Sequence, residues 1–345
     1  MSISENIRTL VVIPNYNGLR FLDDCMSALS EQTVKDFITL VIDNGSGDGD
    51  KDWLTDWQGK DPVHRQLILN HDNLGFSGAV NQGINWALQH DIPYTLLLNN
   101  DTKTAPDFVE SLEKKMDSDT EGRIFALSSK MIKMHDNSVM DDAGDQYTIL
   151  GWQFQRALDE SSSRPLWNQE SQVFSACAGA AMYRTSAFKE VGLFDENHFA
   201  YLEDIDVCFR AQLYGYKVLY YPAAVVQHVG SGTSGSKYND FKVRLSARNS
   251  VYLLYKNLPA FMVIINILPI LAGYLIKQLF FIKKGFGKAY FSGLTEGIRR
   301  SKELKRAKLN EVPPIRYLTL ELKLIAATFE YGSKLIRRYT AKAHG

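Results

Sequence analysis

The sequence predicts an α/β protein with a mixed, mainly parallel sheet flanked by helices, followed by a helical C-terminal region. Within the first 110 residues, short apolar runs alternate with amphipathic segments, which is typical of parallel sheets with crossover helices. From about Lys237 onward the apolar spacing is helical throughout. A hydrophobic fraction of 45% provides enough material for a large core.

The first half of the chain contains the clearest elements. Apolar runs predict strands at 9–14, 38–44, 65–70 and 94–100. Amphipathic segments predict three helices: 18–32, 76–90 with Ser77 as its N-cap, and 106–117, which opens on Pro106. The next part is less regular, with strands expected at 124–132, 179–184 and 217–222 and a helix around 202–214.

The net charge of zero hides two oppositely charged regions. Residues 1–236 hold 18 Lys+Arg and 33 Asp+Glu, whereas residues 237–345 hold 21 and 6, so the regions carry −15 and +15. We therefore expect a catalytic domain over 1–236, with halves 1–110 and 111–236, and a basic helical region over 237–345. The three cysteines are far apart and fit a reducing compartment, and no secretory signal is expected in MSISENIRTL.

The apolar segment 261–282 is long enough to cross a bilayer, but Asn266, Pro269 and Lys277 interrupt it. Basic clusters follow it closely, at Lys283-Lys284 and beyond. This combination predicts helices that lie in the membrane interface and contact anionic headgroups. The alternative is an ordinary helical extension of the core.

Each of the four early strands ends on polar residues, at 14–17, 43–46, 70–75 and 99–101. The carboxyl ends of parallel strands meet at one edge of a sheet, where ligands bind in α/β folds. The alternative for any single end is a turn, because Asn and Asp are common there. No GxGxxG or GxxxxGK[ST] motif is present, which disfavours dinucleotide and P-loop folds. Residues 48–52 resemble the start of a calcium-binding loop, but Trp53 stands where that loop needs glycine and Gly59 where it needs a bidentate Glu. We therefore expect a solvated loop there.

A second acidic cluster lies in YLEDIDVCFR, at 201–210. Glu203, Asp204 and Asp206 could cap a helix, but a partly buried carboxylate in an apolar setting is also a candidate general base. His228 follows a predicted strand; a lone histidine there is more often structural than a ligand.

Seven segments, in order, resemble the motifs of family 2 glycosyltransferases with the GT-A fold: VVIPNYNG, VIDNGSGDGD, NLGFSGAVNQGI, LLLNND, CAGAAMYR, VGLFDENHFAYLEDIDVCFR and HVGSG. The resemblance runs from about Leu10 to Gly232. It is strongest to bacterial rhamnosyltransferases and galactofuranosyltransferases that build cell-surface polysaccharides.

The resemblance implies roles for individual residues. Asp204 takes the place of the catalytic base, beside Glu203. Asp101 and His228 would hold Mg²⁺ or Mn²⁺, although Asn99 replaces the first Asp of the family's DxD motif and leaves one firm carboxylate ligand. Pro14 and Tyr16 would border the nucleotide base, Asp43 would accept its imide N–H, and Asn73 would lie near the ribose and pyrophosphate. The full nucleotide-sugar set is Pro14, Tyr16, Asn17, Asp43, Asn73, Gly78, Asn99 and Asn100, and the acceptor set is Asp195, Glu196 and Asp206.

The implied reaction is a metal-dependent, inverting transfer of a sugar from a dTDP- or UDP-linked donor to a saccharide acceptor, with dTDP-rhamnose favoured over UDP-galactofuranose or another UDP-hexose. We expect a lipid-linked acceptor and an enzyme on the cytoplasmic face of the membrane. A nucleotidyltransferase of the same fold would need a basic loop after the first strand, and IPNYNG has none. An inactive scaffold would be expected to lose Asp101 or the Glu203-Asp204 pair. Apolar residues between the basic clusters argue against a nucleic-acid partner, and the oligomeric state stays open.

Overall fold

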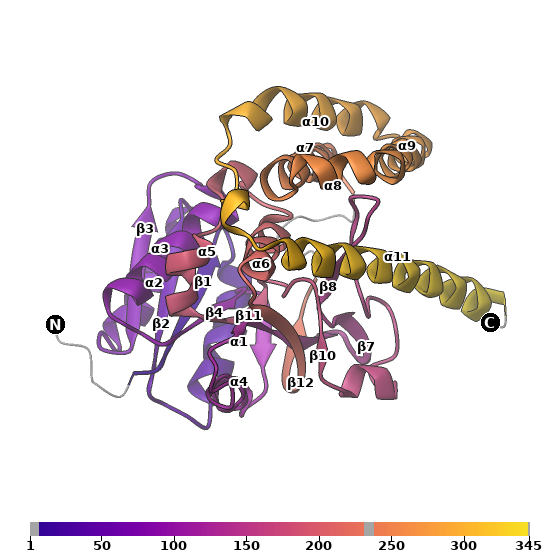
Figure 1. Cartoon of the computed structure of the whole chain (residues 1–345). Coiled ribbons are helices and arrows are strands. Elements are labelled where there is room, and N and C mark those ends of the chain that lie inside the picture. Colours follow the sequence, from indigo (N-terminus) through magenta and orange to yellow (C-terminus); the bar gives the residue numbers. More distant parts are fainter. Residues whose placement is uncertain (1–6, 231–237, 344–345) are drawn as a thin grey trace.

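The computed structural model describes residues 7–230 and 238–343 (Figure 1). The expected boundary at 236–237 and the end of the HVGSG motif lie outside the described residues. The main sheet consists of β1 (Thr9–Asn15), β2 (Phe37–Asn44), β3 (Arg65–Asn70), β4 (Tyr94–Leu98), β5 (Thr102–Thr104), β6 (Ile124–Lys133), β7 (Asp136–Asp142), β10 (Ser171–Gln172), β11 (Ala180–Arg184) and β12 (Lys217–His228). A small separate sheet pairs β8 (Asp145–Tyr147) with β9 (Gln153–Gln155).

The order β10-β12-β6-β11-β4-β1-β2-β3 confirms a mixed, mainly parallel sheet. Strands β3, β2, β1 and β4 are parallel neighbours, and β6 and β12 form a second parallel pair. Strand β11 is antiparallel to both of its neighbours, β4 and β6, and so joins the two parallel groups with all their strands pointing the same way. The carboxyl ends of six strands therefore face one edge.

Helices cover both faces of the sheet because side chains alternate along each strand. Along β1, Val12 packs in the cluster with α3 (Gly75–Gln89), whereas Val11 packs in the opposite cluster with α1 (Leu19–Ser30) and α4 (Phe108–Asp117). Both valines are fully buried. The remaining helices of the body are α2 (Asp48–Gly59), α5 (Phe188–Val191) and α6 (Glu203–Leu213), with short 3₁₀ turns at Pro165–Asn168, Thr185–Ala187 and Glu196–His198.

Three local predictions are wrong. Ser77 is not an N-cap: α3 begins at Gly75, and Ser77 lies buried in its first turn. Pro106 lies two residues before α4 instead of opening it. Residues 48–52 are not a solvated loop but the first turn of α2. There the buried Asp50 accepts hydrogen bonds from the side chain of Asn15, at the end of β1, and from the N–H of Gly18.

The C-terminal region is helical, as predicted: α7 (Asp240–Asn257), α8 (Ala260–Ile265), α9 (Ile267–Lys283), α10 (Gly287–Arg300) and α11 (Pro314–Ala343), with short 3₁₀ turns at Ser301–Glu303 and Leu309–Glu311. The apolar segment breaks at Asn266, whose side chain donates to the carbonyl of Met262 and to Glu321. Pro269 does not break α9, because it lies in the first turn. Within 7–230 and 238–343, no helix is both long and apolar enough to cross a membrane.

The helical region is packed onto the body through α6. One hydrophobic cluster joins Ile205 and Phe209 of α6 to Leu253 of α7 and to Leu320 and Leu324 of α11. Figure 1 shows α11 starting beside α6 and running across the body, with α7, α9 and α10 stacked on the same side. Helix α10 lies against α7 at Gly293, where a Cβ atom would come within 2.2 Å of a backbone oxygen. Helix α6 is thus packed against helices from the far end of the chain.

Candidate active site

The polar ends of β1, β2 and β4 are joined by hydrogen bonds, as their expected convergence requires. The side-chain amide of Asn15 donates through Nδ2 to Asp43 (2.9 Å) and to Asp50 (2.9 Å), and its Oδ1 accepts from the side chain of Asn100 (2.7 Å). Asp50 also accepts from the N–H groups at the start of α1, so it satisfies donors that the helix leaves free. Asn15, Asp43, Asp50 and Asn100 are all buried. The edge of the sheet is therefore a pre-formed polar floor.

Gly18 is required by this floor. A Cβ atom at Gly18 would lie 2.0 Å from the side-chain Nδ2 of Asn100 and 2.5 Å from the side-chain Oδ1 of Asn15. Only glycine lets the start of α1 come this close to the two amides.

The structure places the predicted nucleotide-sugar residues on and around the floor. Tyr16 is 40% exposed, Asn17 and Asn73 are exposed, and Pro14 and Asn99 are half-buried. Asp43 and Asn100 lie below them, and Asp43 uses both oxygens internally, accepting from Asn15 and from the N–H of Ser46. Gly78 is buried in α3, where a Cβ atom would meet Leu74 at 2.8 Å. The rim therefore offers Tyr16, Asn17, Asn73 and Asn99 for contact, while the other members build the support.

Asp101 and His228 are brought together, although they lie far apart in the sequence. Strand β5 pairs with the end of β12, which puts Thr102 opposite His228. His228 Nε2 lies 3.2 Å from Asp101 Oδ1, and its Nδ1 lies 2.7 Å from Asp141 Oδ2. Burial alone would lower the pKa of His228, but the two carboxylates outweigh it and raise the pKa to about 10.

This arrangement fits a divalent cation. Asp101 supplies an oxygen, and His228 supplies an imidazole nitrogen once a cation displaces the proton of Nε2; the two atoms lie 3.2 Å apart at the edge of the sheet. The other ring nitrogen of His228 is held by a carboxylate, which is the usual support of a metal-binding histidine. The described residues thus offer the predicted Mg²⁺ or Mn²⁺ two donors, Asp101 and His228, and a carboxylate that orients the imidazole.

Glu203 and Asp204 begin helix α6. Asp204 is half-buried; burial raises the pKa of its carboxyl to about 6, and backbone N–H groups, including those of Ile205 and Ala178, oppose that rise. Glu203 is buried, and burial together with the charge of Asp204 raises its pKa to about 8. The pKa of Glu203 is raised further than that of Asp204, so Asp204 is the carboxyl that loses its proton first as the pH rises and the better proton acceptor of the pair.

The residues just before β11 connect this pair to the NND segment, which contains Asp101. Asp204 bonds to the N–H of Ala178, and the carbonyl of the next residue, Gly179, accepts from the N–H of Asn99 (2.8 Å). The CAGAAMYR motif thus lies between the candidate base and the NND segment. The two functional elements are only a few backbone bonds apart.

The loop before α6 has an unusual backbone. Phe199, Tyr201 and Leu202 have φ values of 62°, 70° and 68°, a region that non-glycine residues rarely adopt. Asn249 of α7 holds this loop by donating to the carbonyls of His198, Ala200 and Tyr201 at 2.7–3.0 Å. Such strain persists only where the surroundings enforce it, and it is concentrated at functional sites.

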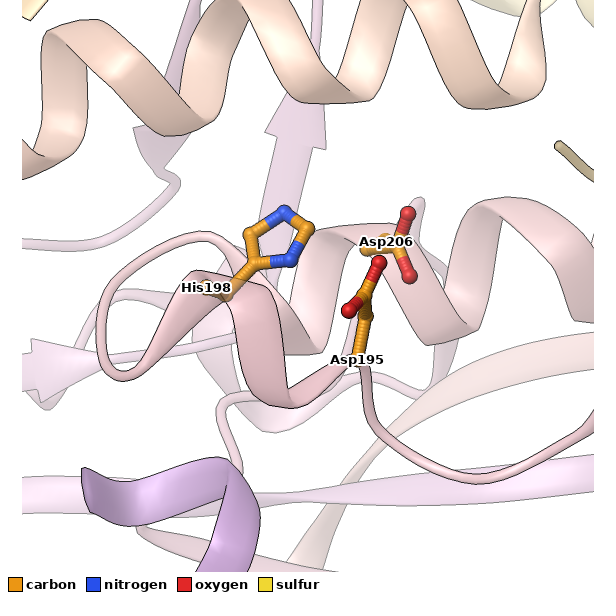
Figure 2. A group of neighbouring side chains, drawn as sticks. All are labelled: Asp195, His198 and Asp206. Atoms are coloured by element: carbon orange, nitrogen blue, oxygen red, sulfur yellow. The ribbon is translucent and has the colours of Figure 1, made fainter. Parts of the chain in front are cut away.

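The predicted acceptor residues Asp195 and Asp206 do not face an open site. Figure 2 shows their carboxylates turned toward each other beside His198. One oxygen from each aspartate and one ring nitrogen of His198 all lie within 4.8 Å of one another, a spacing that could hold a metal. The ammonium of Lys256 already takes that position, 2.5 Å from Asp195 and 2.9 Å from Asp206.

Asp206 is fully buried and also bonds to Arg210 and Asn257. Burial would raise the pKa of Asp206, but Lys256 and Arg210 outweigh burial and hold it well below its usual range. Burial lowers the pKa of His198 to about 4, so that ring is neutral. The acceptor role expected for Asp206 therefore does not fit the structure, in which Asp206 and Asp195 fasten α6 to α7. Glu196 is exposed and accepts from Asn81 (3.0 Å).

Sequence reasoning missed Asn15, Asp50, Asp141, Asn249 and Lys256. Asn15 and Asp50 lie inside quoted motifs, so their neighbourhood was visible although their roles were not. Asp141 lies in MDDAGD, near the end of β7, in a segment for which the sequence predicts neither a strand nor a helix. Asn249 and Lys256 lie in the basic helical region, where nothing local distinguishes them from surface residues.

Comparison with known proteins decides the family. The model of glycosyl transferase family 2 matches residues 10–192, more than half of the chain. The chain belongs to glycosyl transferase family 2. This family 2 enzyme is a glycosyltransferase that acts in polysaccharide or glycan synthesis.

Several curated relatives resemble the enzyme over most of their length. The N-acetylglucosaminyl-diphospho-decaprenol L-rhamnosyltransferase of Mycobacterium tuberculosis is 27% identical over 243 residues, covering 65% of this chain and 77% of the relative. The amylovoran biosynthesis glycosyltransferase AmsB of Erwinia amylovora is 23% identical, covering 70% and 76%.

Solved structures show the same fold. The mannosyltransferase PcManGT from Pyrobaculum calidifontis, in complex with GDP-Man and Mn²⁺, has a TM-score of 0.51 at 16% identity and covers 95% of this chain and 87% of its own. GalNAc-T7 with UDP, GalNAc and Mn²⁺ has a TM-score of 0.57 at 14% identity, covering 73% of this chain and about half (48%) of that chain. The family 2 enzyme therefore has the GT-A fold predicted from its motifs.

Proposed function

We propose that the enzyme transfers a sugar, L-rhamnose from dTDP-rhamnose as first choice, to a hydroxyl of a lipid-linked saccharide with inversion at the anomeric carbon. The observation that carries the proposal is the pairing of Asp101 with His228 at the same edge of the sheet as Asp204. The relative from Mycobacterium tuberculosis supports the donor and acceptor classes, because its name specifies an L-rhamnosyltransferase and a diphospho-decaprenol substrate.

The residues of this chain divide the reaction between them. Asp204 takes the proton of the acceptor hydroxyl while that oxygen forms a bond to the anomeric carbon. The bond between the anomeric carbon and the phosphate oxygen breaks, and its electron pair leaves with the nucleoside diphosphate. Asp101 and His228 would hold a divalent cation, whose charge neutralises the departing diphosphate. The exposed ring of Tyr16 and the amides at the rim position the donor.

A donor screen tests this proposal. Purified enzyme is incubated with a lipid-linked saccharide acceptor and, in separate reactions, with dTDP-rhamnose, UDP-galactofuranose or another UDP-hexose, with Mn²⁺ or with EDTA, and release of the nucleoside diphosphate is measured. We expect release from dTDP-rhamnose only with the cation. Full turnover in EDTA would contradict the metal assignment, and turnover with a UDP-sugar alone would contradict the donor assignment.

We also propose that the helical region lies on the cytoplasmic membrane surface. Exposed leucines and isoleucines follow one face of α9, at Leu268, Leu271, Leu275, Leu279 and Ile282, with exposures of 56–76%. Further exposed apolar side chains occur on the neighbouring helices: Ile264, Ile265, Phe291, Ile298, Leu318, Leu322, Phe329 and Ile336. This apolar surface belongs to the region of charge +15, a combination that suits an anionic bilayer.

Sedimentation with vesicles tests the membrane proposal. Leu268→Glu and Leu275→Glu should each reduce binding to vesicles that contain anionic lipid, because each places a charge on the apolar surface. Leu166→Glu is the matched control, since Leu166 is a 44% exposed leucine on the catalytic body. Equal binding by all three variants would refute the assignment of this surface.

A further inference from the structure

A basic cavity lies between α11 and the catalytic body, away from the candidate active site. It has a volume of about 210 Å³ and is lined by Lys217, Arg316, Lys323, Gln172 and Gln212, among others. Lys217 begins β12 and His228 ends it, so the strand separates the cavity from the metal site by on the order of 30 Å at ~3.3 Å per residue. The cavity therefore cannot hold the diphosphate of the donor.

The cations of this cavity lack acidic partners. Within 7–230 and 238–343, neither Arg316 nor Lys217 has a side-chain hydrogen bond or ion pair, and no carboxylate lines the cavity. Lys323 donates to Gln212 Oε1 (2.7 Å), a neutral group. Burial and the charge of Arg316 both lower the pKa of Lys323. Tyr216, which lines the cavity, donates its hydroxyl to Glu190, which is not part of the lining.

The chain makes room for this arrangement. Gly215 has a φ of 92° and lies beneath the guanidinium of Arg316, where a Cβ atom would come within 2.5 Å of Nη2. Gln212 is held by its own donation to the carbonyl of Phe174 (2.9 Å), which turns its oxygen toward Lys323. Two cations thus lie together on a cavity whose lining contains no carboxylate.

The position of the cavity on α11 indicates the source of an anion that would bind there. On α11, Arg316 and Lys323 lie at i and i+7, on the flank of the exposed apolar strip formed by Ile315, Leu318 and Leu322. Basic side chains beside an apolar strip reach the phosphate level when the strip enters a bilayer. An arginine and a lysine around a small cavity suit a phosphate group in both charge and shape.

We propose that this cavity binds the phosphate of an anionic lipid headgroup and thereby fixes how α11 sits on the membrane. The inference rests on the proposed membrane association, which it extends by naming a specific headgroup site. It does not involve the residues assigned to sugar transfer.

The test compares two double variants that remove the same charge. Arg316→Gln/Lys323→Gln removes the cavity cations, whereas Arg299→Gln/Lys302→Gln removes two exposed cations that line no part of the cavity. Full-length proteins are sedimented with phosphatidylcholine vesicles that contain about 30 mol% phosphatidylglycerol as the anionic lipid. We expect the cavity variant to bind at least tenfold more weakly than the control variant. Equal losses would mean general electrostatic attraction and would overturn the proposal.

Two further measurements keep the result interpretable. Arg316→Lys keeps the charge but loses the planar fork, so it should also bind more weakly than wild type; Arg316 is exposed and makes no side-chain bond within the described chain, so this variant should fold. Thermal unfolding with inorganic phosphate, against chloride at equal ionic strength, tests a soluble source. Stabilisation of wild type by phosphate, with equal vesicle binding of both double variants, would overturn the lipid assignment. Donor turnover without vesicles should be unchanged in all variants, which separates this test from that of the catalytic proposal.

Discussion

Replacing Lys256 with methionine tests whether the Asp195–His198–Asp206 group is a structural ion-pair cluster. Lys256 has a side-chain exposure of 4% and lies between Asp195 and the fully buried Asp206. Methionine fills a similar volume, so the change removes the charge without leaving a large cavity. Removing one partner of a buried pair typically costs about 3–5 kcal/mol, because a charge is left uncompensated.

We expect a loss near the lower end, about 3 kcal/mol, because Arg210 still contacts Asp206 at 3.0 Å. Urea unfolding followed by circular dichroism measures it, and the slope of free energy against urea should not change. Lys60→Met is the matched control: Lys60 also pairs with an aspartate, Asp56, but both side chains are more than 60% exposed. The control should unfold within error of wild type.

The pH dependence gives a second reading of the same variant. The pKa of Asp206 is depressed in the folded protein, so its contribution to stability is present above the unfolded value of about 4 and is lost as the pH falls below it. Wild type should therefore lose more stability than Lys256→Met between neutral and acidic pH. A loss below 1 kcal/mol at pH 7, or parallel pH curves, would refute the structural interpretation of the cluster.

Three other predictions concern catalysis. Asp204→Asn should lower kcat at least ~10²-fold with nearly unchanged donor binding. In the wild type, kcat/KM should fall as one proton binds below about pH 6, since only the ionised carboxylate accepts a proton. Normal turnover by the variant would exclude Asp204 as the base. Asp141→Asn should weaken Mn²⁺ binding ~10–100-fold by calorimetry, because it loses the carboxylate that orients His228; unchanged affinity would remove that role. Asn249→Ala should lower kcat more than donor affinity, as it frees the strained loop before α6; equal kinetic constants would show that the loop holds itself.

The sequence predicted the fold well because the fold depends on local patterns. Each apolar run of the first half became a strand within two residues of the expected limits, since a strand buried on both faces has few alternatives. Of the three expected interruptions of the apolar segment, only Asn266 separates two helices, and its buried amide bonds to Met262 and Glu321; α9 continues through Pro269 and Lys277.

The site was only partly predictable, because its supports come from distant segments. The polar strand ends could be expected to meet, since parallel strands share an edge. Nothing local could place Asp141 behind His228 or Asn249 beneath the loop before α6, as these contacts span 87 and about 50 residues. Asp206 was misjudged for the same reason: its partner Lys256 lies 50 residues away in a basic helical segment.

The NND segment shows how such distant contacts bear on the chemistry. Asp101 is the one carboxylate of this segment; of the two amides, the side chain of Asn100 bonds to Asn15, whereas Asn99 is fixed through its backbone N–H to Gly179. A lone carboxylate is a weak site for a divalent cation, which prefers several oxygen or nitrogen ligands. His228 adds a second donor atom, Nε2, which lies 3.2 Å from Asp101 Oδ1. Asp141 holds the imidazole in the orientation that presents Nε2 to Asp101. In the proposed function, a histidine from the end of β12 would therefore take the place of the first DxD aspartate, with Asp141 as its support.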